Sequence, residues 1–101
     1  MIMVPDWLGA EHVEQARAAV PRGRAPLLDR VRLERLEEGR CVQTLHVGPY
    51  DAEGPVLEEM HRTVIPGYGL VMTGRHHEIY LSDPRRVDAS RLRTLLRQPV
   101  G

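Results

Sequence analysis

The feature that most constrains the fold is an alternating stretch from Arg75 to Leu81, which the turn-forming run Ser82–Pro84 closes. As a β-strand, it places a carboxylate between an imidazole and a phenol on one face, with Glu78 flanked by His76 and Tyr80. The opposite face is mostly apolar, and we expect it to be the core side: His77, Ile79 and Leu81.

Around this strand, hydrophobic periodicity predicts helices and further strands. In chain order we expect a strand at 1–4, a helix at 10–20, an extended segment at 27–47 with a strand at 41–47, a helix starting at Pro55, the strand at 75–81 and a last strand at 93–100. The sequence therefore predicts an α+β fold: an antiparallel sheet with helices on one face. It contains one strand–helix–strand–strand module plus an N-terminal strand and helix.

Composition limits the classes of function. With 101 residues we expect one domain, 1–101, and the formal net charge is zero, which argues against direct nucleic-acid binding. No run reaches the roughly 20 apolar residues needed to span a membrane, and the first residues do not resemble a secretion signal. The single cysteine, Cys41, fits a reducing compartment, so we expect a cytoplasmic protein.

Glu78 has two readings. On a solvent-exposed face it is an ordinary strand carboxylate; lining a pocket, burial would raise its pKa and make it a counter-ion for a cationic ligand or a general base. Tyr80 would then bond a ligand or hold Glu78 in one rotamer, whereas its alternative is a half-buried aromatic at the rim.

Further candidates for ligand contacts are residues at the ends of strands and the rare aromatics. They are His76 beside Glu78, His46 and Tyr50 around the turn at Gly48, and the single tryptophan, Trp7. Tyr50 has an equally good alternative as a turn residue packing on the following helix. The histidines lack the spacing of a metal site, and no phosphate loop is present, so we expect neither metal nor cofactor.

Several segments together resemble the GyrI-like small-molecule-binding family. They are Leu27–Arg32, Leu36–Gly39, Cys41–Gln43, His46–Asp51, Arg75–Arg86 and Leu95–Val100. The family is related to the effector-binding domains of multidrug-responsive transcription regulators. Its members typically pair two strand–helix–strand–strand modules across a ligand cleft. The resemblance is to the C-terminal half, with 1–26 as the remnant of a first module plus connector and 27–101 as the second module.

The resemblance implies that Glu78 matches the acidic residue of the cleft and meets hydrophobic, often cationic or aromatic compounds. One branch of the family is reported to hydrolyse cyclopropanoid toxins with a glutamate and a tyrosine. Glu78 with Tyr80 or Tyr50 would then be the catalytic pair. A third possibility is a protein-interaction module that sequesters a partner such as a topoisomerase. Because a half-length chain would leave a one-sided cleft, we expect a homodimer that rebuilds it.

Overall fold

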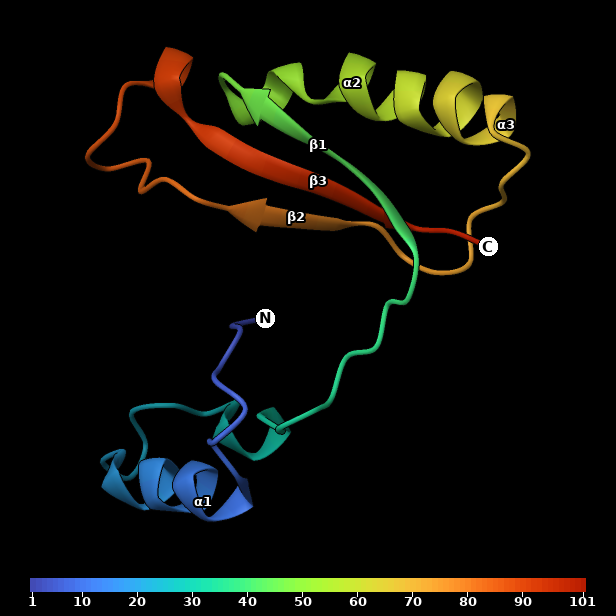
Figure 1. Cartoon of the computed structure of the whole chain (residues 1–101). Coiled ribbons are helices and arrows are strands. Elements are labelled where there is room, and N and C mark those ends of the chain that lie inside the picture. The colour runs from blue at the N-terminus through green and yellow to red at the C-terminus, as the bar shows by residue number, and fades with distance from the viewer. The chain divides into compact units, whose positions relative to one another are not determined.

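The structure is a computed structural model that describes all 101 residues (Figure 1). It consists of two compact units, Met1–Leu36 and Glu37–Gly101. The predicted division at residue 26 into a first-module remnant and a second module stays a prediction.

The first unit contains helix α1 (Ala10–Ala19) and a short 3₁₀ turn, η1 (Leu28–Arg30). The predicted helix at 10–20 is confirmed, and its start is held by the Gly9 N–H, which donates to His12 Nδ1 at 2.9 Å. The strand expected at 1–4 is wrong, because these residues have no partner strand and are exposed.

The second unit contains a three-stranded antiparallel sheet with the order β1-β3-β2. Its strands are β1 (Cys41–Val47), β2 (His77–Tyr80) and β3 (Arg93–Pro99), and a 3₁₀ turn, η4 (Ala89–Arg91), leads into β3. Together with the helices this sheet confirms the α+β class. Pro99 ends β3, where its missing N–H costs no ladder bond.

Residues 31–40 form no strand, so the extended prediction from residue 27 holds only for β1. The part of this segment that belongs to the second unit, residues 37–40, is held to the sheet by side chains and by one backbone bond, in which the Val100 N–H donates to the Arg40 carbonyl oxygen at 2.8 Å. Glu38 forms ion pairs with His77 of β2 and with Arg97 of β3, the latter at 3.0 Å. Gly39 then turns the chain with a φ of 66°, a conformation that favours glycine.

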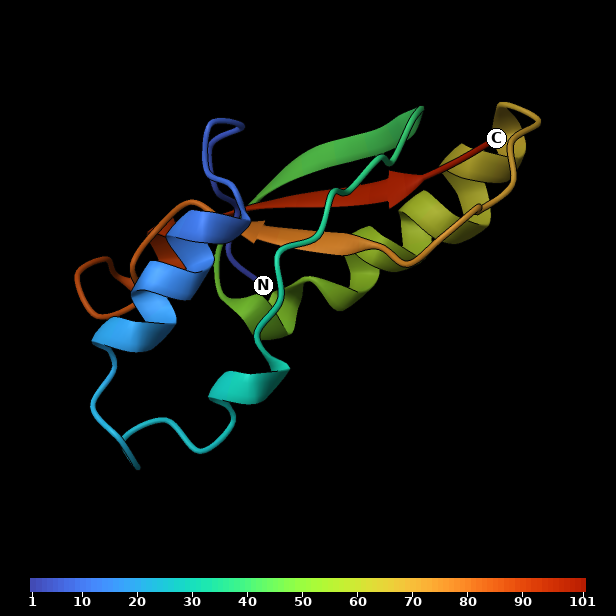
Figure 2. The same cartoon turned by 90° about the horizontal axis from the view of Figure 1, so that it is seen from below.

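One helical segment lies along the sheet (Figure 1 and Figure 2). It follows the 3₁₀ turn η2 (Tyr50–Ala52) and runs through α2 (Gly54–Glu59), the π-helical stretch η3 (Met60–Val64) and α3 (Ile65–Gly67). The core lies between this helix and the sheet, and it contains Met60, Ile65, Leu96 and Val100. The predicted helix from Pro55 is confirmed, and it begins one residue earlier, at Gly54.

The helix covers the face of the sheet that carries Glu78, which corrects the expected core side. Leu96 of β3 is fully buried, and its cross-strand partners are Glu78 in β2 and Thr44 in β1, so all three share one face. The next set of paired residues, Leu45, Leu95 and Ile79, lies on the other face of the sheet. Figure 2, turned by 90°, shows the helix running along the sheet, as in Figure 1.

The membrane prediction concerns helix length and hydropathy. Every helix of the structure is too short or too polar to cross a bilayer.

Candidate functional site

Glu78 is half-buried on the face of β2 that the helix covers. On that face its neighbours along the chain are His76 and Tyr80. The Tyr80 hydroxyl donates to Glu78 Oε2 at 2.8 Å, and His76 Nε2 lies 3.6 Å from Glu78 Oε1. The predicted common face of these three side chains is therefore confirmed. The Tyr80 hydroxyl therefore holds the Glu78 carboxylate in one orientation, and the His76 imidazole lies next to the other carboxylate oxygen.

A tight turn after β1 brings a second aromatic ring to Tyr80. The rings of Tyr50 and Tyr80 meet edge to face with centroids 5.1 Å apart. His46, which is mostly buried, donates from Nε2 to the Pro49 carbonyl oxygen at 3.0 Å and so fixes the turn. Gly48 has a φ of 136°, which side chains rarely adopt, so this geometry depends on glycine.

Two buried polar residues that the sequence reading missed lie beside this group. Glu53, the residue before α2, is 4% exposed, and Thr94 of β3 is fully buried. Thr94 pairs with His46 and Tyr80 on the neighbouring strands, which places it on the same face. Glu53 Oε1 and Thr94 Oγ1 both lack a hydrogen-bond partner, although the two side chains are near one another.

The spacing of the helix could have identified Glu53. Its residue number is three, four and seven less than those of Val56, Leu57 and Met60, which form the buried helical face. A carboxylate at a core-facing position is unusual and indicates a specific role. Similarly, Thr94 alternates with the buried Leu96 in β3.

The electrostatics of the site favour protonated groups. Burial raises the pKa of Glu53, and the charge of Glu78 raises it further, while Thr94 and His46 act in the opposite direction. The hydrogen bond to Glu78 raises the pKa of Tyr80, with smaller contributions from burial and nearby charges. Tyr80 therefore keeps its proton at neutral pH and acts as a donor to Glu78.

At the other end of the group, His76 meets a histidine from the helix. The ring centroids of His76 and His61 are 5.8 Å apart, and His61 Nε2 donates to Gln98 Oε1 at 2.9 Å. The Gln98 amide in turn donates to the Gly74 carbonyl oxygen at 2.7 Å. No group of three or more potential metal-ligating side chains occurs in the structure.

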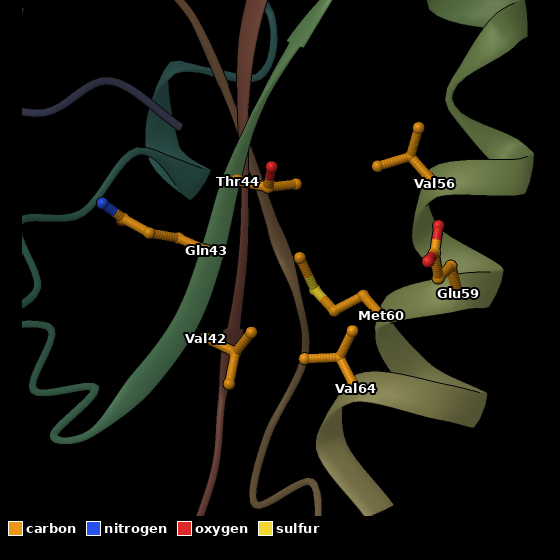
Figure 3. A pocket seen from close by; sticks show the side chains of 7 residues that line it. All are labelled: Val42, Gln43, Thr44, Val56, Glu59, Met60 and Val64. Atoms are coloured by element: carbon orange, nitrogen blue, oxygen red, sulfur yellow. The ribbon is translucent and has the colours of Figure 1, made fainter. Parts of the chain in front are cut away.

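A separate hollow of about 330 Å³ lies between β1 and the helix (Figure 3). Val56, Met60 and Val64 point from the helix toward the strand, and Val42 and Thr44 point toward the helix, whereas Gln43 points away. None of the predicted ligand-binding residues lines it. Because Thr44 and Glu78 flank Leu96 on opposite sides in the register, this hollow is distinct from the Glu78 group.

Trp7, the remaining candidate, belongs to the first unit. Its exposed ring packs edge-on against His12, with centroids 5.9 Å apart. Its role in ligand binding stays a prediction.

The α+β architecture is that of a family of ligand-binding domains. Residues 10–100 match the model of the GyrI-like small molecule binding domain. Since the match covers most of the chain, the chain belongs to this family, and the resemblance noted from its sequence is confirmed. A comparison with curated proteins found no match.

Three solved structures from Listeria innocua are similar to this chain. An uncharacterized conserved protein is 41% identical, with a TM-score of 0.82, and the match covers 97% of this chain and 50% of that one. Two proteins described as hydrolases are 39% and 38% identical, both with TM-scores of 0.78, and the matches cover 97% of this chain and 52% and 50% of theirs. The chain thus spans about half the length of these relatives.

Proposed function

We propose that the chain binds hydrophobic, cationic or aromatic small molecules beside Glu78. The observation that carries this proposal is a half-buried carboxylate, held by the Tyr80 hydroxyl and bordered by the ring pair Tyr50–Tyr80. A carboxylate attracts a cation, and aromatic faces add cation–π attraction and area for burial. His76 and His46 remain proposed contacts of the same ligand, and Trp7 remains a predicted ligand-binding residue of the first unit.

Two ligands of nearly the same shape but different charge test this function. N-methyl-4-phenylpyridinium carries a permanent positive charge, and 4-methylbiphenyl is its neutral counterpart of nearly the same shape. We expect calorimetry to show that the protein prefers the cation, and that Glu78→Gln removes this preference without unfolding the chain. The exposed Glu59→Gln, in the separate hollow, is the matched control and should bind as the parent does. Equal affinity of Glu78→Gln and the parent for the cation would reject the proposal.

A second candidate is hydrolysis of cyclopropanoid-type electrophiles, favoured by the two similar structures described as hydrolases. Glu78 would take a proton from water as the water oxygen attacks a ring carbon. The broken carbon–carbon bond would leave its electron pair on a conjugated carbonyl, which Tyr80 or Tyr50 would protonate or orient. Product formation that Glu78→Gln abolishes while binding persists would identify an enzyme. The third expectation, a protein-interaction module, stays a prediction.

We further propose a cytoplasmic homodimer. Because the helix covers the Glu78 face of the sheet, the face left for a second copy is the opposite one, so this dimer would not rebuild a cleft over Glu78 as the sequence led us to expect. On that face Leu45 and Val47 are 48% and 56% exposed, and Leu81, just after β2, is 55% exposed. Adjacent exposed apolar side chains of this kind mark interaction surfaces, and the similar structures are about twice as long. Sedimentation equilibrium should give twice the chain mass; a monomer at all concentrations would contradict the dimer.

A further inference from the structure

We propose that Glu53 is a second recognition carboxyl of this site and sets its preference for the charge of the ligand. With Glu53 ionised, the site takes an aromatic dication; with Glu53 protonated, it takes a monocation. This inference rests on the function proposed for Glu78 and extends it to ligand class.

The position of Glu53 links it directly to Glu78. It interacts with Glu78 and Thr94, and its carboxyl lies over the row of β3 and β2 residues that contains Thr94 and Tyr80. Two carboxyls therefore converge on one side of the sheet. The titratable groups that act on Glu53 are Glu78 and His46, and Glu53 in turn acts on Tyr80, whose ring meets that of Tyr50. His76 lies beside Glu78.

The protein supplies no strong cation to this pair of acids. The chain has 14 arginines and no lysine, yet no arginine forms an ion pair with Glu53 or Glu78. The basic groups beside the two acids are histidines: His46, near Glu53, uses Nε2 for the Pro49 carbonyl oxygen, and His76 Nε2 lies 3.6 Å from Glu78 Oε1. Buried carboxylates are normally paired, so an acid pair without arginine indicates that a ligand brings the positive charge.

Buried polar atoms also lack partners at this point. Glu53 Oε1 and Thr94 Oγ1 are both out of contact with water and make no hydrogen bond of good geometry, although Thr94 and Glu78 lie close enough to shift the pKa of Glu53. Polar atoms in this state are rare in native proteins and need an explanation. A cationic ligand would compensate the charge of Glu53, and a ligand that also carries an N–H group would donate to Thr94 Oγ1.

A purely structural role does not account for Glu53. It stands at the N-cap position of α2, where a side-chain oxygen often accepts a helix N–H, but it makes no such bond. It also has no salt bridge. Its burial and the charge of Glu78 raise its pKa, so its charge changes within an accessible pH range above that of an ordinary glutamate.

Two aromatic cations of almost the same shape, one with a single charge and one with two, test the inference on the full chain. N-methyl-4-phenylpyridinium carries one permanent charge and N,N′-dimethyl-4,4′-bipyridinium carries two, in almost the same shape. In the parent protein, the ratio of dication to monocation affinity should rise on the order of tenfold from pH 4 to pH 8 as Glu53 ionises. A ratio that does not change with pH would overturn the inference without any variant.

Glu53→Gln and Glu53→Asp separate charge from shape. Glu53→Gln should lower the affinity for the dication on the order of tenfold at pH 8, leave that for the monocation within about threefold and flatten the pH profile. Glu53→Asp should keep the pH dependence. Because His46 and His76 remain in both variants, an unchanged profile in Glu53→Gln would assign the titration to them and overturn the inference.

The same data distinguish this failure from that of the proposed function. If Glu78→Gln leaves both cations bound as in the parent, the Glu78 site itself is wrong, and the role of Glu53 fails with it. If Glu78→Gln loses both cations while Glu53→Gln weakens them equally or not at all, only the role of Glu53 fails.

Discussion

Leu96→Ala tests whether the core lies on the Glu78 side of the sheet. Leu96 is fully buried in the central strand and packs in one cluster with Met60, Ile65 and Val100. Removing a buried leucine side chain costs the transfer energy of the lost atoms plus that of the cavity left behind, about 2–5 kcal/mol. A value near the middle of this range is expected, because Leu96 contacts the helix on one side and strands on both flanks.

That loss is large for a unit of this size. The second unit spans residues 37–101, and domains of this length shift in Tm by about 4–8 °C per kcal/mol. A cost of about 3 kcal/mol therefore lowers Tm by about 12–24 °C. Leu45→Ala is the matched control, since Leu45 lies on the opposite face and is 48% exposed. Its expected cost is about 1 kcal/mol or less.

Circular dichroism during heating and urea titration measures both variants. The measurements are made at dilutions where Tm no longer depends on protein concentration, so that association of copies does not stabilise Leu45. The reasoning is refuted if Leu45→Ala destabilises the chain as much as Leu96→Ala, because the core would then lie on the other face.

Three further predictions concern the site. Because the pKa of Glu53 is raised in the folded state, its favourable contribution is present below about pH 4.5 and is lost as pH rises through the folded pKa; Glu53→Gln should flatten this decline in urea titrations, and an unchanged slope would contradict it. Gly48→Ala should cost about 1–3 kcal/mol from backbone strain, since the added Cβ would meet His46 Nε2 only at an ordinary 3.6 Å; a neutral effect in thermal melts would refute the strain. Absorbance at 295 nm should show one of the three tyrosines ionising above pH 10, because the pKa of Tyr80 is raised; Tyr80→Phe should remove that component and leave the other two.

The sequence was sufficient for the helices and for strands β1, β2 and β3, but not for the side of the sheet that the helix covers. Alternation in residues 75–81 correctly placed His76, Glu78 and Tyr80 together. However, the apolar content of one strand does not determine which face is buried. The buried face is set by the pairing of β2 with β3, which puts Glu78 beside Leu96, and by the helix, which packs on Leu96.

The missed residues have different causes. Thr94 alternates with Leu96 in β3, but the apolar Leu95 lies on the other face, so the alternation alone does not show which face is buried. Glu53 follows the 3.6-residue periodicity of Val56 and Met60, and helical projection extended one turn toward the N-terminus would have found it. The strand expected at Met1–Val4 failed because an apolar run is a strand only when another strand pairs with it.

The most direct test of the account locates the ligand. Nuclear Overhauser effects from the N-methyl group of bound N-methyl-4-phenylpyridinium identify the protons next to the positive charge. We predict contacts to the side-chain protons of Glu78 and to the rings of Tyr80 and Tyr50. Contacts instead to the methyl groups of Val56 and Met60 would put the ligand in the hollow beside β1 and contradict the central role of Glu78.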